Sequence, residues 1–273
     1  MSESTMASDH HASNEAIVST EASVGQTGKE MSLVGHLEDL RGVVFRCLIA
    51  LLVGCIAVGI FLPFVAEALK WPLNWASGGE VSLHTTSVMA VFAMALQVCF
   101  LGGFGLSLPL MLYFIARFVM PGLNKRERSL LRPMCGLIFF LFILGGTFSF
   151  LILVPMSVKA ALFFNEKLGY TEIWTADRYY GLLTWMVFGV GLMFQLPLVV
   201  TALVSIGLVH SQQLARFRPY SIVIFLGLAA VITPTTDPFT FLILTLPMVL
   251  LYELALRFAR RIERKREEEE AAA

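Results

Sequence analysis

The sequence predicts an all-α integral membrane protein with six transmembrane helices and both termini in the cytoplasm. Hydrophobic residues make up 57% of the 273 positions and charged residues only 15%, whereas a soluble globular protein carries about 25% charged residues. The apolar residues gather in six long stretches. Lys and Arg, in contrast, fall mostly in the segments that an alternating path through the membrane places on one side. Together these observations exclude a soluble domain.

The six apolar stretches are expected to be helices, because backbone N–H and C=O groups cannot stay unpaired in lipid. Most of the stretches approach the ~20 apolar residues that cross ~30 Å of hydrocarbon. They cover residues 42–64, 88–116, 133–154, 180–208, 219–232 and 238–256.

The second and fourth stretches contain residues that bend helices or let them approach closely. Gly102, Gly103 and Gly105 precede Pro109 in the second, and Pro197 interrupts the fourth. Proline removes a backbone donor, and glycine allows close contact between helices. We therefore expect bends or close helix contacts, and a curved helix arrangement rather than a straight bundle.

The fifth stretch is unusually short. Only residues 220–232 separate Pro219 from the turn at Thr233 and Pro234, and thirteen residues at ~1.5 Å each reach about 20 Å. The sixth stretch is little longer. The hypothesis is that this C-terminal pair lies in a locally thinned bilayer.

The distribution of basic residues sets the orientation. Of the 20 Lys and Arg, one side receives only Lys70, Lys159, Lys167 and Arg178, which leaves 16 for the side of the termini. Cytoplasmic segments of membrane proteins are enriched in Lys and Arg. Both termini are therefore expected in the cytoplasm, in a multi-pass protein of the bacterial cytoplasmic (inner) membrane.

The chain is expected to divide into a tail, a membrane domain and a second tail. Residues 1–31 lack apolar periodicity and are expected to be a disordered cytoplasmic tail. Residues 32–262 form the six-span domain, and residues 263–273 a charged cytoplasmic tail. The run 257–273 is either a frayed helical extension or a solvated tail, and the solvated tail is favoured.

Two segments on the outer side, 65–87 and 155–179, are expected to lie along the membrane surface as short amphipathic pieces. They carry Trp71, Trp75 and Trp174, and tryptophan favours the headgroup layer.

Enzymatic chemistry is not expected. The sequence has no Walker A motif, no dinucleotide-binding glycine pattern, no H-E-x-x-H and no G-x-S-x-G. The four cysteines, Cys47, Cys55, Cys99 and Cys135, lie in or beside predicted spans and are interpreted as small buried apolar residues. We expect no cofactor and no metal. A secondary transporter or channel for a small solute remains the alternative function, although such a protein would carry several ionisable residues near the bilayer midplane and internal repeats.

Two carboxylates near span ends are candidates for binding. Asp39 lies in the run H-L-E-D-L-R before the first span, with Glu38 and Arg41 beside it, and this run is also consistent with a plain interfacial anchor. Glu127 is the only acid in the basic loop between spans two and three, where its own neighbours could satisfy it. If both carboxylates face the cytoplasm, they form a receptor for a basic peptide, because guanidinium groups bind carboxylates through paired hydrogen bonds.

Two further polar residues lie inside or next to spans. Gln195 falls midway along the fourth stretch, where a polar side chain needs a partner or water. Either an intramolecular helix contact or a contact with another subunit is consistent with it. Asp237, just before the sixth stretch, is expected to cap that helix.

Several motifs in order resemble the TatC family, the multispanning receptor subunit of the twin-arginine protein translocase. H-L-E-D-L-R is similar to the family signature H-L-x-E-L-R, with Asp39 in place of the usual Glu. The other matching runs are 106–109 with Phe118, Pro121 and 125–128, then 194–197, 218–220, 233–234 and 237–239. The resemblance covers about residues 32–262.

The resemblance implies a cup-shaped six-helix protein that recognises the paired arginines of signal peptides on folded precursor proteins. It implies that Asp39 and Glu127 bind these arginines, that Glu38 can share the role, and that Phe118, Pro121 and Arg128 surround the site. It further implies single-span partner subunits similar to TatA and TatB, assembly in a larger complex, and transport driven by the proton-motive force. Relatives often carry Glu where this chain has Gln195, and because Gln is neutral it does not support a proton-linked role at this position.

Overall fold

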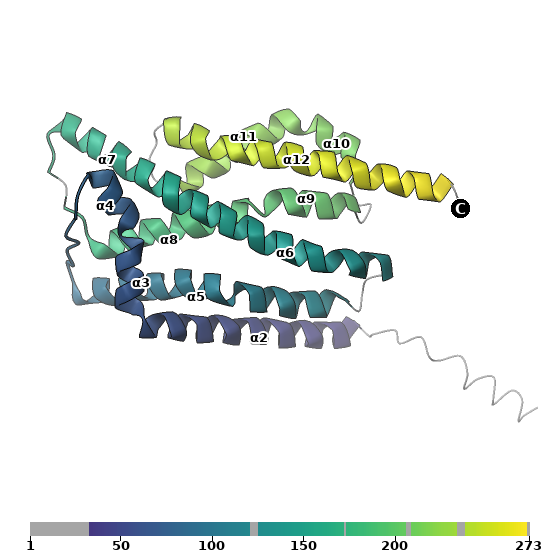
Figure 1. Ribbon diagram of the computed structural model, residues 1–273, viewed down its shortest axis with the longest axis horizontal. Coiled ribbons are helices and arrows are strands. Elements are labelled where there is room, and N and C mark those ends of the chain that lie inside the picture. Colours follow the sequence, from purple (N-terminus) through teal and green to yellow (C-terminus); the bar gives the residue numbers. More distant parts are fainter. Residues whose placement is uncertain (1–32, 121–124, 172, 206–208, 234–237, 272–273) are drawn as a thin grey trace, which may run out of the picture. The chain divides into compact units, whose positions relative to one another are not determined.

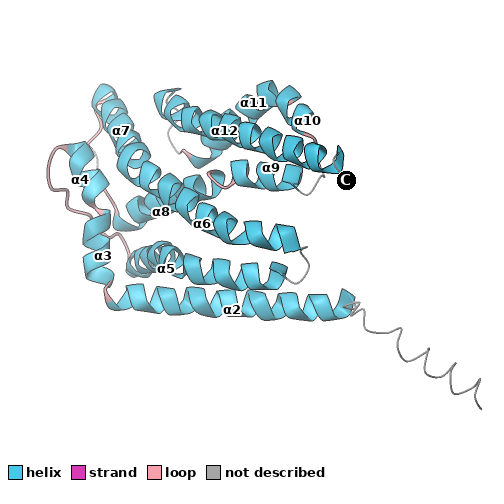
Figure 2. Ribbon diagram, turned by 45° about the vertical axis from the view of Figure 1, so that its right-hand side comes forward, coloured by secondary structure: helices cyan, strands magenta, loops and turns pink. Residues whose placement is uncertain are grey.

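The computed structural model describes residues 33–120, 125–171, 173–205, 209–233 and 238–271. Only the backbone is described for residues 33–37, 125–132, 205, 238–239, 265–267 and 269–271. The chain divides into two compact units, Met1–Val44 and Phe45–Ala273, and each is treated by itself. The described residues are helical apart from connections and one isolated bridge (Figure 2).

The helices follow one another along the chain as labelled in Figure 1. They are α2 (Leu33–Ile60), α3 (Leu62–Leu69), α4 (Trp71–Ser77), α5 (Val88–Val119), α6 (Lys125–Phe148), the π-helical turn η2 (Ser149–Leu153), α7 (Val154–Leu168), α8 (Ala176–Met193), α9 (Leu196–Ser205), α10 (Ser211–Arg216), α11 (Arg218–Ile232) and α12 (Pro238–Ala271). The part of α2 up to Val44 belongs to the first unit, and everything after it to the second.

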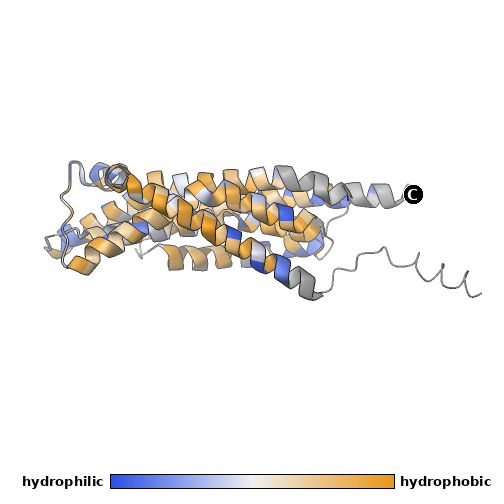
Figure 3. Cartoon of the chain, turned by 90° about the horizontal axis from the view of Figure 1, so that it is seen from below, coloured by the Kyte–Doolittle hydropathy of each residue, from blue (hydrophilic) through white to orange (hydrophobic). Residues whose placement is uncertain are grey.

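Among the described residues, five helical segments are long and apolar enough to cross a membrane, as predicted for five of the six apolar stretches. They are Glu38–Ile60, Val88–Val119, Pro133–Leu168, Ala176–Val204 and Thr240–Arg264, and Arg218–Ile232 is a shorter apolar helix. Hydrophobic residues dominate these helices, and hydrophilic residues gather near their ends (Figure 3). The short fifth stretch is therefore a real helix, but one of only 15 residues.

Prolines lie where the first span ends and where the helical geometry of the third span changes. Pro63 lies at the start of α3 and follows a turn at Phe61, so the first long helix ends at Ile60, four residues earlier than expected. In the third span Pro155 is the second residue after η2. Because proline cannot donate to the carbonyl four residues back, a wider π-helical turn before it is a common adjustment.

Two segments differ from expectation because helices run further than the apolar stretches. The outer segment 155–179 is mostly a continuation of the third span, since α7 extends to Leu168. The segment 257–273, for which a solvated tail was favoured, is helical as far as Ala271. Arg, Lys, Glu and Ala are strong helix formers, so the helix continues after the apolar residues stop. The candidate span Thr240–Arg264 is 25 residues long, but its last eight residues include four arginines, and the locally thinned bilayer stays a hypothesis.

The core of the second unit lies around α8, which packs against α5, α6 and η2. Its residues Leu183, Met186 and Val190 are fully buried. Glycines permit the closest contacts between helices. A Cβ atom on Gly103 of α5 would lie 2.6 Å from the backbone nitrogen of Cys55, and one on Gly54 would lie 2.6 Å from the carbonyl oxygen of Gly103. The close helix contact predicted from the glycines of the second stretch is confirmed.

One end of the second unit is held together by bonds between distant segments, and we call it the tethered end. It comprises α3, α4, α7, the start of α8 and the connection around His84. The Tyr179 hydroxyl donates to the carbonyl of Leu69 at 2.7 Å, and the Tyr180 hydroxyl to that of Ala66 at 2.9 Å. These carbonyls belong to the last turn of α3, where helices lack internal donors.

The connections themselves are joined at the tethered end. The His84 N–H donates to the Trp174 carbonyl, and the Ala176 N–H donates to the His84 carbonyl, both at 2.9 Å. Trp71 stacks on Trp75, with ring centroids 6.2 Å apart, and the ammonium of Lys159 lies 3.8 Å from the centre of the Trp75 ring. The first outer segment, predicted to lie along the membrane surface as short amphipathic pieces, forms the short helices α3 and α4 with Trp71 and Trp75 exposed, and its location at the membrane surface stays a prediction.

Candidate functional site

The acidic residues before the first span lie on α2 within the first unit. The side chains of Glu38, Asp39 and Arg41 are all exposed. Within the described part of the chain, no ion pair involves either carboxylate. Helical geometry places adjacent residues about 100° apart around the axis, so Glu38 and Asp39 point in different directions. Both carboxylates remain accessible to a cationic ligand from solution.

The second candidate carboxylate lies on a helix, not in a loop. The loop expected between spans two and three is shorter, because α6 begins at Lys125 and already contains Glu127 and Arg128. The helix also continues through Pro133, which has no backbone N–H, so one hydrogen bond of the helix is missing there. Phe118 is half-buried in the last turn of α5. Pro121 and the side chains of Glu127 and Arg128 lie outside the described residues, so the meeting of Asp39 and Glu127 stays a prediction.

Gln195 lies where the fourth span breaks. α8 ends at Met193 and α9 starts at Leu196, and Pro197 supplies no N–H to the carbonyl of Met193. The backbone N–H of Gln195 donates to the Leu192 carbonyl at 2.9 Å instead of to that of Gly191. The bend predicted at Pro197 is confirmed.

The Gln195 side chain compensates for this break. Its amide nitrogen donates to the carbonyl of Gly191 at 3.4 Å and to that of Ile138 on α6 at 3.2 Å. The intramolecular helix contact considered from the sequence is thus present. The side-chain oxygen Oε1 is buried and has no partner among the described residues. This acceptor is therefore unsatisfied among the described residues and is shielded from the surface.

Pro109, Pro197 and Asp237 are assigned structural roles from the sequence, and the structure describes the two prolines. Pro109 lies inside α5 and is exposed, while Pro197 is buried at the start of α9. Asp237 lies outside the described residues, so its expected capping of the last helix stays a prediction. Among the described residues, no group of three or more His, Cys, Asp or Glu is arranged to hold a metal ion.

Known proteins similar to this chain identify its family. The family profile described as Sec-independent protein translocase protein (TatC) matches residues 35–247. A TatC protein of Magnetococcus marinus is 32% identical over 240 residues, which cover 88% of each chain. One of Aquifex aeolicus is 31% identical over 243 residues, 87% of this chain and 98% of the relative. A crystal structure of the twin arginine translocase receptor TatC aligns with a TM-score of 0.70 at 30% identity, over 83% of this chain and 99% of that chain.

This chain belongs to the TatC family. TatC proteins are components of the Sec-independent, twin-arginine protein translocase, so the chain is a membrane protein of a protein-transport system that works together with other Tat subunits. The family is a translocase component and not an enzyme family. Candidate residues from Glu38 to Asp237 all lie within the matched region, whereas the second half of α12 lies beyond it.

Sequence reasoning missed one intramembrane polar residue of this TatC chain. Gln97 on α5 is half-buried and faces α8, where a Cβ on Gly181 would lie 3.1 Å from its amide nitrogen. Its Oε1 atom is buried without a partner among the described residues, and the Thr184 hydroxyl donates to its backbone carbonyl at 3.4 Å. A lone Gln within an apolar stretch is the signal that could have found it.

An ion pair connects the last helix to α11. Glu253 lies four residues before Arg257, a spacing that favours a pair one turn apart, but its Oε2 atom lies 2.9 Å from Nη2 of Arg218 at the start of α11. The pair therefore joins two helices instead of bracing one. The signal for it was the basic residue before Pro219, which sequence spacing alone could not assign to a partner.

Proposed function

We propose that this TatC protein is the receptor and core subunit of a twin-arginine translocase, and that it binds the Arg-Arg motif of signal peptides on folded precursor proteins. The observation that carries the proposal is the carboxylate of Asp39 on α2, which lies directly before the apolar part of that helix, is exposed and has no ion pair among the described residues. Glu38 supplies a second carboxylate next to it. Glu127, in the first two turns of α6, is the other acid that we assign to the site.

The chemistry suits the ligand. A guanidinium group donates two parallel hydrogen bonds to a carboxylate, and each charge-assisted bond contributes about 1.5–3 kcal/mol. Two carboxylates that each bind one arginine thus distinguish a twin-arginine peptide from a peptide with a single arginine, which one carboxylate could not do. Phe118, Pro121 and Arg128 are assigned to the surroundings of this site.

The proposed topology has six spans, with α11 as the fifth, and both termini in the cytoplasm. It is supported by the five long apolar helices, by the 15-residue apolar α11 and by the placement of 16 of the 20 basic residues on one side. The tethered end then faces outward, and the protein is placed in the bacterial cytoplasmic membrane. The spans are proposed to form a cup.

We assign recruitment of single-span subunits similar to TatA and TatB to the concave membrane face. The polar Gln195 within the fourth span supports this, because polar side chains join helices within the bilayer. Its Oε1 atom is buried in the described part of the chain, so a donor on a partner helix would reach it only after the surrounding helices move. Transport energy is assigned to the proton-motive force.

Charge reversal tests the receptor proposal. Asp39→Lys and Glu127→Lys should each abolish crosslinking of a photoreactive twin-arginine signal peptide to membranes that contain the protein. Glu166→Lys is the matched control, because Glu166 is an exposed acid on α7 at the tethered end and should leave crosslinking intact. Equal loss in all three variants would refute the assignment.

Conservative variants sharpen this test. Asp39→Glu restores the side chain usual in the family and should retain or increase crosslinking. Glu38→Gln measures how far the neighbouring carboxylate shares the site: an unchanged yield assigns the role to Asp39 alone.

A further inference from the structure

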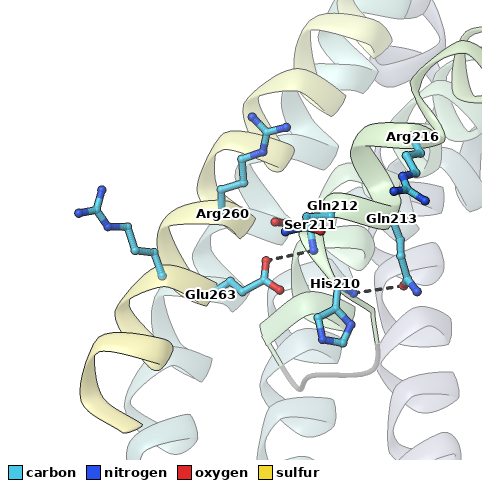
Figure 4. A pocket seen from close by; sticks show the side chains of 8 residues that line it. His210, Ser211, Gln212, Gln213, Arg216, Arg260 and Glu263 are labelled. Carbon is cyan, nitrogen blue, oxygen red and sulfur yellow. Dashed lines mark hydrogen bonds between the residues drawn. The ribbon is translucent and has the colours of Figure 1, made fainter. Parts of the chain in front are cut away.

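A polar cavity of about 370 Å³ lies between α10 and the second half of α12. Figure 4 shows the side chains around it, with Glu263 of α12 directed at Ser211 of α10. The cavity is lined by His210, Ser211, Gln212, Gln213, Arg216, Arg260, Glu263 and Arg264. None of the candidate signal-peptide residues contributes to it.

Two hydrogen bonds hold its walls together. The Ser211 N–H donates to Oε2 of Glu263 at 3.1 Å, and the Tyr252 hydroxyl donates to the Leu214 carbonyl at 2.9 Å. Tyr252 and Glu263 are separated by three helical turns, or about 16 Å along α12. α10 is therefore fixed along α12 at two points, and the cavity is a built feature of the fold.

Two of the arginines that line the cavity are available to bind an anion. The Glu263 carboxylate is engaged by the Ser211 N–H, and Arg264 pairs with Glu268 at 2.9 Å. Arg216 and Arg260 are exposed and have no ion pair within the described part of the chain. Their guanidinium groups extend from opposite walls, one from α10 and one from α12 (Figure 4).

The position of the cavity along the helix indicates which anion it meets. The apolar stretch of α12 ends at Leu256 and is followed by Arg257, Arg260, Arg261 and Arg264, so Arg260 lies about one helical turn beyond it. Lipid phosphates occupy the layer directly outside the hydrocarbon, and basic pockets between helices at this level bind anionic head groups. Arginine also matches phosphate oxygens through paired hydrogen bonds.

We propose that this cavity binds the phosphate of an anionic phospholipid head group, held between Arg216 and Arg260. The same phosphate chemistry could be supplied by soluble inorganic phosphate, and the experiment below separates the two sources. The proposal concerns lipid binding and does not depend on the signal-peptide receptor function. Of the two arginines, Arg260 lies beyond the region matched by the family profile and Arg216 lies within it.

The test uses the full-length protein in nanodiscs of phosphatidylcholine that contain a small fraction of photoreactive phosphatidylglycerol. The double variant Arg216→Gln/Arg260→Gln should lower the yield of crosslinked lipid about tenfold, because it removes the charge-assisted bonds on both walls. Arg46→Gln/Arg178→Gln removes the same charge from two other exposed arginines and should lower the yield much less. Equal losses in the two double variants would overturn the proposal.

A third variant is expected to act in the opposite direction. Glu263→Gln keeps an acceptor for the Ser211 N–H but removes the only negative charge in the cavity lining, so the yield should rise. A decrease in this variant, with native elution in size-exclusion chromatography, would also overturn the proposal.

Inorganic phosphate distinguishes the two sources of ligand. Added at constant ionic strength, it should leave the crosslinking of the wild-type protein nearly unchanged, because the lipid is held in the layer by its acyl chains as well. Full displacement by inorganic phosphate would assign the cavity to a soluble anion and contradict the lipid assignment.

Discussion

The side-chain amide of Gln195 donates a hydrogen bond to the carbonyl oxygen of Ile138, 3.2 Å away on α6. The same nitrogen donates to Gly191, whose carbonyl has lost its backbone donor at the break between α8 and α9. One polar side chain thus repairs a helix break and joins that break to a neighbouring helix.

Gln195→Leu should therefore destabilise the protein. The substitution leaves the carbonyls of Gly191 and Ile138 without this donor inside the apolar region, at a cost of about 1–2 kcal/mol. Thermal unfolding of the protein in detergent should show a lower midpoint. Gln212→Leu, at an exposed position on α10, is the control and should change the midpoint little; an equal effect of both variants would contradict the bonding described.

Removing the hydroxyl of Tyr180 should loosen the tethered end. Tyr180→Phe leaves the Ala66 carbonyl unpaired in a buried place, which costs about 1–3 kcal/mol. The aromatic packing stays, so the loss comes from the bond alone. Tyr170→Phe is the matched control, because Tyr170 is 69% exposed. The measurement is the thermal midpoint together with the rate of limited proteolysis between α4 and α5, which should rise only for Tyr180→Phe.

A methyl group on Gly103 should force α5 away from the helix that carries Cys55. Its Cβ would lie 2.6 Å from a backbone nitrogen, and backbone cannot move aside as a flexible side chain can. We expect Gly103→Ala to cost about 1–3 kcal/mol. Gly105→Ala introduces the same group two residues later, where nothing lies within 4 Å, and should be neutral or stabilising because alanine favours helix. Similar midpoints for the two variants would show that the contact is not made.

The ion pair between Arg218 and Glu253 should give a measurable coupling. Both side chains are partly exposed, at 43% and 32%, so solvent screening limits the coupling to about 0.2–1 kcal/mol. A double-mutant cycle with Arg218→Gln and Glu253→Gln measures it from thermal or denaturant unfolding. The corresponding cycle with Arg257→Gln and Glu253→Gln should give no coupling, which separates the interhelical pair from the one-turn pair that sequence spacing favoured.

Much of the fold could be predicted from the sequence because lipid imposes a simple length requirement. The apolar stretches located five spans and the short helix α11, and Pro197 located the break in α8 and α9. The ends of helices were harder to predict. Lys125 to Arg132 and Arg257 to Ala271 continue as helix because their residues favour it, although hydropathy gives no sign of this.

The hydrogen-bond partners of individual side chains were the hardest feature to predict from the sequence. Tyr180 bonds to the backbone of Ala66, 114 positions earlier, and every residue offers such a carbonyl, so no pattern singles one out. The exposure of Asp39 follows from its place before the apolar residues, and the internal contact of Gln195 was one of two open alternatives. The arrangement of Asp39 and Glu127 together rests on resemblance, and the proposed peptide crosslinks test it.

The bonds at the tethered end have a mechanical consequence. The connection around His84 is fastened to the residues before α8, and the tyrosines of α8 are fastened to α3, so the starts of α5 and α8 are clamped at one extremity. Any rocking of these helices during a transport cycle would have to pivot there, with its amplitude growing toward the opposite extremity. We expect conformational change in this protein to be greatest far from His84. Hydrogen–deuterium exchange along α5 and α8 measures this, and uptake should increase with distance from His84.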